Sequence, residues 1–128
     1  MLVGRCLCGG IEYEIDGRVG PIDFCHCSYC RRASGSAFAS NATISRASFR
    51  LRSGDALLKE YESTASKFRS FCSACGSPIY ARHSAAPEIL RIRVGTLSSD
   101  PTSRPRGHFD VDSKAPWFRI ADDLPQTP

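Results

Sequence analysis

Seven cysteines carry the chemistry that this sequence could perform, and they fall into three tight groups. The densest group is Cys25-His26-Cys27-Ser28-Tyr29-Cys30, which places three thiols within six residues. The other four thiols form two pairs, Cys6-Leu7-Cys8 and Cys72-Ser73-Ala74-Cys75. Structural zinc takes four protein ligands, whereas catalytic zinc usually takes three and leaves a position for water or substrate. The four-plus-three division therefore predicts one closed and one open zinc site.

The central stretch has a geometry that suits three sulfur ligands. Alternate residues of an extended segment share a face, so Cys25 and Cys27 point one way and His26 the other. A turn after Cys27 would bring Cys30 back to the same ion. We therefore expect His26 to lie outside the site, where it either relays a proton or hydrogen-bonds a backbone carbonyl.

The composition limits the class of protein. The chain has 128 residues, of which 41% are hydrophobic and 23% charged. These values predict one globular domain over residues 1–128, with a core at about 2–118 and a tail at 119–128 that frays from Leu124 onward. No apolar run approaches the length of a membrane span, and no signal-peptide pattern follows Met1. We expect a cytoplasmic protein, whose reducing surroundings keep thiols available for metal rather than for disulfides.

The basic residues outnumber the acidic ones but are scattered. Seventeen Lys and Arg against thirteen Asp and Glu give a formal net charge of +4. Several basic residues alternate with apolar ones, which predicts solvated strand faces, and without a run of like charges nucleic-acid binding is not indicated. The alternating basic residues are Arg50, Arg52, Lys67, Arg69, Arg91 and Arg93.

Short strands must position the cysteines, because apolar and polar residues alternate in many segments and no ten-residue stretch has helical periodicity. Turns rich in Gly, Pro and Ser separate these segments. The sequence therefore predicts an all-β fold of short antiparallel strands with few or no helices. The expected strands cover residues 11–15, 22–24, 37–44, 48–52, 57–61, 67–71, 78–82, 89–95 and 108–111.

Strand pairing could also bring the two outer cysteine pairs together around one ion, with neighbouring glycines giving the backbone the freedom to turn. The remaining candidates have simpler interpretations. We expect Trp117 to pack in the core or line a pocket, and His108 to take a surface or core position in the last strand. Gly35 is expected to serve a turn.

Four motifs in this order resemble the glutathione-dependent formaldehyde-activating enzyme (Gfa) family, which also includes the centromere protein V group. They are the stretches 4–9, 25–32, 71–76 and 112–117. The resemblance extends through nearly the whole chain and implies a single β-tent domain with two zinc ions. It implies structural zinc at Cys6, Cys8, Cys72 and Cys75, and catalytic zinc at Cys25, Cys27 and Cys30.

The resemblance further implies a carbon–sulfur lyase that forms S-hydroxymethylglutathione from glutathione and formaldehyde. A zinc ion with three thiolates and an open position can hold an exogenous thiol as its thiolate, which is the nucleophile. We therefore expect a small thiol such as glutathione and a small aldehyde as partners. Arg31 and Arg32 could clamp carboxylates of a peptide-like thiol or lie exposed on a loop, and Tyr29 could line the pocket or only pack.

Two other classes of function fit the same cysteines. A zinc-ribbon-like binding module would use both metal sites structurally, and a hidden fourth ligand beside Cys25, Cys27 and Cys30 would favour it. A metal or redox sensor would use the soft sulfur ligands for copper(I) or for thiol exchange. The metal content, and the reactivity of Cys30 toward an alkylating agent, separate these classes.

Overall fold

The structure is a computed structural model that describes residues 1–128. It contains ten short strands and one α-helix. This composition confirms the all-β prediction. The helix α1 spans Ser28–Ser34, and 3-10 turns lie at Arg46–Ser48, Val94–Thr96 and Val111–Ser113. The strands are β1 (Leu2–Arg5), β2 (Glu12–Ile15), β3 (Ile22–Cys25), β4 (Ala39–Ser45), β5 (Phe49–Ser53), β6 (Leu58–Thr64), β7 (Lys67–Cys72), β8 (Pro78–His83), β9 (Ile89–Arg93) and β10 (Pro105–Phe109).

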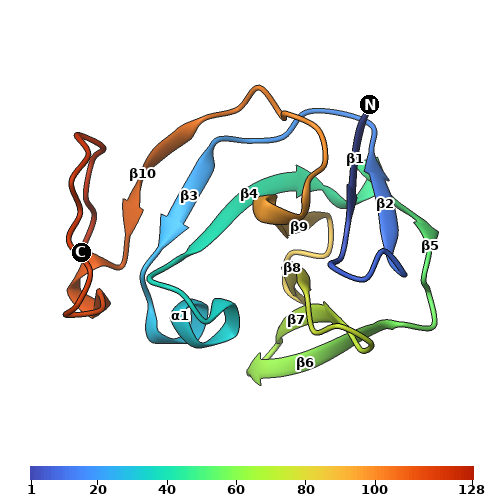
Figure 1. Ribbon diagram of the computed structural model, residues 1–128, viewed down its shortest axis with the longest axis horizontal. Helices are drawn as coiled ribbons and strands as arrows, with labels where there is room; N and C mark the ends of the chain where they lie inside the picture. Colours follow the sequence, from blue (N-terminus) through green and yellow to red (C-terminus); the bar gives the residue numbers. More distant parts are fainter.

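The strands form two sheets (Figure 1). The smaller sheet has the order β1-β2-β5, and the larger one has the order β10-β3-β4-β9-β8-β7-β6. All pairs are antiparallel except β10 with β3, which run parallel. Every expected strand has a counterpart within a few residues. No helix is long and apolar enough to cross a membrane.

The main core lies between the two sheets. Tyr13 and Ile15 of β2, in the smaller sheet, belong to one core cluster with Ile44 of β4 and Ile92 of β9, in the larger sheet. All four side chains are fully or almost fully buried. Tyr13 stacks on Phe49 with ring centroids 5.1 Å apart. Burial of such side chains contributes about 1.5–3 kcal/mol each. The contact between sheets therefore fixes how the cysteine-bearing turns of the two sheets meet.

Part of the opposite face of the larger sheet is polar and yet buried. Residues paired in register share a face, which places Asp23, Asn41 and Arg93 in one row across β3, β4 and β9. Arg93 is 8% exposed and Arg69 of β7 is 9% exposed. The prediction of solvated strand faces is therefore wrong for these two arginines.

The C-terminal segment adds to the edge of the larger sheet at β10 (Figure 1). The backbone N–H of His108 donates to the carbonyl of Pro125 at 2.9 Å, and the N–H of Thr127 donates back to the carbonyl of His108 at 2.9 Å. The expectation that the chain frays from Leu124 onward is wrong, because these hydrogen bonds satisfy the open edge of β10. Trp117 was also misassigned: it is 72% exposed.

Candidate metal centres

Four sulfur atoms gather where the two sheets meet, and we call them the four-sulfur centre: Cys6, Cys8, Cys72 and Cys75. All four lie within 4.8 Å of one another. The Sγ atom of Cys8 is 3.5 Å from that of Cys6 and 3.9 Å from that of Cys72. A tetrahedral zinc ion with Zn–S bonds of about 2.3 Å requires sulfur atoms about 3.8 Å apart. The donor set therefore fits one structural zinc ion.

Two tight turns from different sheets form the four-sulfur centre. Cys6 follows β1 of the smaller sheet, and Cys72 ends β7 of the larger one. The backbone N–H of Leu7 donates to Ser77 Oγ at 2.8 Å and so joins the two turns directly. The expected strand pairing between the turns is not what unites them. Packing of one sheet on the other and this hydrogen bond do so instead.

The second group is the three-sulfur centre, made of Cys25, Cys27 and Cys30, whose sulfur atoms also lie within 4.8 Å of one another. Cys25 ends β3, Cys27 is the N-cap of α1, and Cys30 lies in the first turn of that helix. The Sγ atom of Cys27 accepts the backbone N–H of Cys30 at 3.3 Å. The turn expected after Cys27 is thus the start of a helix, which Gly35 ends in the left-handed conformation (φ 63°).

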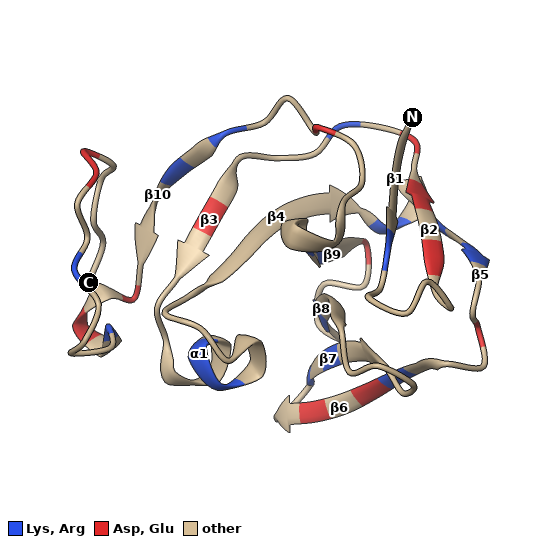
Figure 2. Ribbon diagram, in the orientation of Figure 1, with Lys and Arg blue, Asp and Glu red and all other residues tan.

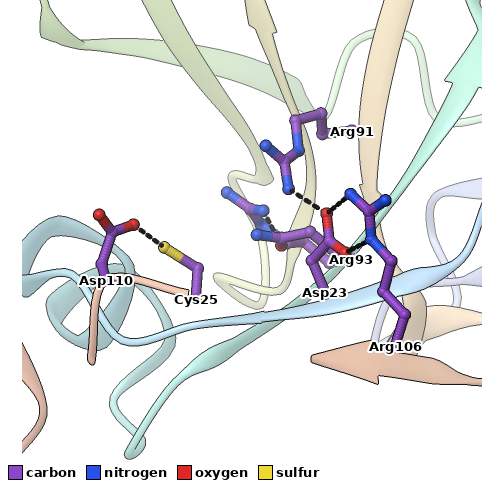
Figure 3. Close-up of polar contacts among 7 residues, drawn as sticks. Asp23, Cys25, Arg91, Arg93, Arg106 and Asp110 are labelled. Carbon is purple, nitrogen blue, oxygen red and sulfur yellow. Dashed lines mark hydrogen bonds and ion pairs between the residues drawn. The ribbon is translucent and has the colours of Figure 1, made fainter. Parts of the chain in front are cut away.

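No imidazole or carboxylate joins the three sulfur atoms within the same distance of one another. His26 is fully buried and lies outside the centre, as expected; its Nε2 atom contacts Nδ1 of His108 at 2.7 Å rather than a backbone carbonyl. Asp110 comes closest to a fourth donor. Its Oδ2 atom accepts a hydrogen bond from the Cys25 thiol at 3.3 Å (Figure 3). Its backbone is in the left-handed conformation (φ 56°), directly after the end of β10. The three-sulfur centre therefore fits a metal ion with one position left for an exogenous ligand.

Neighbouring groups lower the pKa of the Cys30 thiol in the three-sulfur centre. The hydrogen bond with Cys25 lowers the pKa of Cys30 to about 4, against the effect of burial, with further contributions from Cys27, Arg93 and Arg69. The same hydrogen bond raises the pKa of Cys25. The Nη1 and Nη2 atoms of Arg69 lie 3.9 and 4.0 Å from Cys30 Sγ. A lowered pKa favours the thiolate, which is the form that binds a metal ion.

A groove of about 560 Å³ runs between α1 and the β6–β7 hairpin. It reaches the three-sulfur centre through Arg69, which contacts Cys30 and also lines the groove. Figure 2 shows the basic residues of α1 on one side and the charged residues of β6 on the other, where Lys59 is followed by the acidic Glu60 and Glu62. The lining residues are Ser28, Tyr29, Arg32, Ala33, Tyr61, Ser63 and Arg69.

Of the three residues expected to contact substrate, two line the groove and one does not. Tyr29 and Arg32 line the groove, whereas Arg31 turns away and its Nε atom donates to the carbonyl of Ser113 at 3.1 Å. Two comparable hollows around residues 16–20 contain no cysteine. Sequence reasoning missed Arg69 and Asp110, because strands far apart in the chain bring them to the cysteines.

Comparisons with known proteins find a matching family, a relative and a similar solved structure. The sequence profile of the family described as glutathione-dependent formaldehyde-activating enzyme matches residues 1–113. A protein of Halomonas elongata, provisionally named as a glutathione-dependent formaldehyde-activating enzyme, is 27% identical over 128 aligned positions, which cover 94% of this chain and 81% of that protein. A crystal structure of a Rhodobacter sphaeroides protein superposes with a TM-score of 0.66 at 28% identity, covering 77% of this chain and 89% of that one.

Proposed function

Because the chain belongs to the glutathione-dependent formaldehyde-activating enzyme family, we propose that it is a zinc-dependent carbon–sulfur lyase. It would add a small thiol, glutathione or a relative, to a small aldehyde, and catalyse the reverse reaction. The observation that carries the proposal is the three-sulfur centre, which has no fourth protein donor and adjoins a groove. Three protein ligands with an open position are typical of catalytic zinc.

The two centres would have different roles. Cys6, Cys8, Cys72 and Cys75 would hold a structural zinc ion that ties the two sheets together. Cys25, Cys27 and Cys30 would hold the second zinc ion, which, when bound, supplies a position at which an incoming thiol is held as its thiolate.

The groove would bind the rest of the thiol. Arg32 presents a guanidinium group that can bind a carboxylate through two parallel hydrogen bonds. Tyr29 and Tyr61 are half or more exposed and flank the same groove from α1 and β6, where their rings can contact a peptide-like backbone. We assign the carboxylate contact to Arg32 rather than to Arg31, since the Arg31 side chain is hydrogen-bonded to the 111–113 turn.

The reaction balances without an oxidant or a reductant. The thiol gives its proton to solvent when it binds, and its sulfur then forms a bond to the carbonyl carbon. The carbon–oxygen π bond breaks, and the oxygen takes up one proton from solvent. The product is a thiohemiacetal, and the reverse sequence breaks the carbon–sulfur bond.

A structural role for both centres is the second candidate, and the Asp110 contact favours it. A carboxylate 3.3 Å from Cys25 Sγ could become a fourth ligand if it moved toward Cys27 and Cys30. The centre would then be closed, and the chain would be a zinc-ribbon-like binding module. Replacing Asp110 with Asn should leave thiol binding intact if the proposed function is right.

Exchange spectroscopy by NMR on glutathione and formaldehyde tests the proposal at equilibrium. Thiol–aldehyde addition also occurs without an enzyme, so the exchange rate must be compared with a protein-free sample and with the Cys27→Ser variant. We expect the intact protein alone to accelerate the exchange. Equal rates in all three samples would refute the glutathione–formaldehyde activity.

A further inference from the structure

Two arginines lie buried beside the three-sulfur centre without a carboxylate partner. Arg69 donates through Nε to Ser63 Oγ at 3.1 Å, and Arg93 donates through Nη1 to Asn41 Oδ1. Neither guanidinium group takes part in an ion pair with an acidic residue. Since a buried charge is stable only when other groups compensate it, an anion other than a protein carboxylate must face these two.

Asp23 cannot be that anion, although it is the only buried acidic residue of the chain. Its Oδ1 atom accepts Arg106 Nε at 2.6 Å, and its Oδ2 atom accepts Arg91 Nη2 at 3.3 Å (Figure 3). Asp23 is thus shared by two arginines already. Asp110, on the other side of the centre, is exposed and contacts Cys25 rather than either arginine.

The sulfur atoms of the three-sulfur centre are the other groups near these arginines that can carry negative charge. Both Nη atoms of Arg69 lie within 4.0 Å of Cys30 Sγ. Arg93 is buried on the face of the larger sheet that also carries Cys25, since Cys25 pairs with Ala39 of β4 and Arg93 pairs with Asn41, two residues further along that strand. The contact of Arg69 and the position of Arg93 on this face therefore both bring a positive charge to the three-sulfur centre.

We propose that Arg69 and Arg93 are the counter-charges of the three-sulfur centre and enable it to hold one further thiolate. A divalent metal ion with three thiolates carries one net negative charge, and a fourth thiolate makes it two. The two guanidinium charges match that total, which favours an anionic sulfur ligand over a neutral one. The identity of the fourth anion rests on the proposed function. The role of the arginines toward the cysteines rests on the contact of Arg69, the position of Arg93 and the burial of both.

Zinc retention tests the role toward the cysteines without any substrate. Arg69→Gln and Arg93→Gln remove the charge, the corresponding Lys variants keep it, and Arg106→Gln is the control because that arginine pairs with Asp23. In competition with a chelator, the Gln variants should lose the second zinc ion about tenfold more readily than the wild type. The Lys and control variants should stay within about twofold, and the first zinc ion reports folding. Unchanged retention in both Gln variants, or an equal loss in the control, would overturn the proposal.

Thiol affinity tests the second half of the proposal. Zinc-loaded wild type and variants are titrated with glutathione and with 2-mercaptoethanol, which has no carboxylate. Each Gln variant should bind both thiols about tenfold more weakly, because the lost charge acts on the sulfur. Weakening for glutathione alone would mean that the arginines bind carboxylates and would overturn the counter-charge role. A wild type that binds neither thiol would refute the proposed function and the fourth thiolate, while the retention result would still decide the role toward the cysteines.

Discussion

Nε2 of His26 and Nδ1 of His108 lie 2.7 Å apart in the interior, although 82 residues separate them in the chain. His108 Nε2 in turn contacts Asp122 Oδ2 at 3.0 Å. Because the carboxylate accepts, His108 donates from Nε2 and receives the Nε2 proton of His26 at Nδ1. The C-terminal segment is thereby connected to the residue between two candidate metal ligands.

His108→Ala should destabilise the protein by about 2–4 kcal/mol, because it leaves His26 Nε2 without a buried partner and opens a cavity. Urea unfolding of the zinc-loaded protein measures the change. His83→Ala, on an exposed histidine of β8, is the matched control. A loss from His108→Ala no larger than that of the control would show that the histidine pair does not stabilise the fold.

Gly4→Ala tests the contact between β1 and the main core. A Cβ atom at this position would lie 2.3 Å from the ring of Tyr13, which is fully buried and cannot move freely. We expect a loss of about 1–3 kcal/mol. Gly95→Ala is the control, because a Cβ atom at that position would meet no atom within 4 Å, and it should change the stability little. Thermal unfolding of both variants and the wild type measures the two effects. Equal stability of the two variants would contradict the described packing.

Glu60 should make a small contribution to stability that depends on pH. The hydrogen bonds from Arg82 at 2.6 and 2.7 Å, and then its charge, lower the pKa of Glu60 in the folded state. The contribution is therefore present above the unfolded value of about 4.3 and is lost as the pH falls through the lower folded value. Glu60→Gln should lower the free energy of unfolding by about 0.5 kcal/mol at pH 7 and should not change it at a pH below the folded pKa of Glu60. A cost that is the same at both pH values would argue against this pair.

Cys75→Ser and Cys27→Ser should have different consequences. Structural zinc contributes about 10–16 kcal/mol of apparent binding free energy in small domains, which equals or exceeds the stability of a whole domain. Cys75→Ser should therefore give an unfolded or insoluble chain. Cys27→Ser should fold, keep one zinc ion and lose thiol binding. Metal analysis and circular dichroism distinguish the two, and equal loss of folding would mean that both centres are structural.

The sequence was sufficient to predict the sulfur groups but not everything around them. Cys25, Cys27 and Cys30 are so close in the chain that almost any fold brings them together. The helix that carries Cys30 was not predicted, because seven residues are too few for helical periodicity and cysteine is not a preferred N-cap. Gly35 was the one signal of its end.

Arg69 shows why the surroundings could not be predicted. The alternation in β5 (Phe49–Ser53) and in β7 (Lys67–Cys72) is the same, and both predict a solvated basic face. However, β5 is an edge strand of the smaller sheet, whereas β7 lies inside the larger one. Which basic face becomes buried depends on the order of strands, and this order is set by contacts between residues far apart in the chain.

Cadmium NMR of the full chain with both centres loaded tests the central claim most directly. Two resonances should appear, one from the four-sulfur centre and one from the three-sulfur centre, and the Cys27→Ser variant identifies the second by losing it. Addition of glutathione should shift the second resonance toward that of a four-sulfur site and leave the first unchanged. If neither resonance shifts when glutathione is added to the fully cadmium-loaded protein, the result would contradict an open thiol-binding centre.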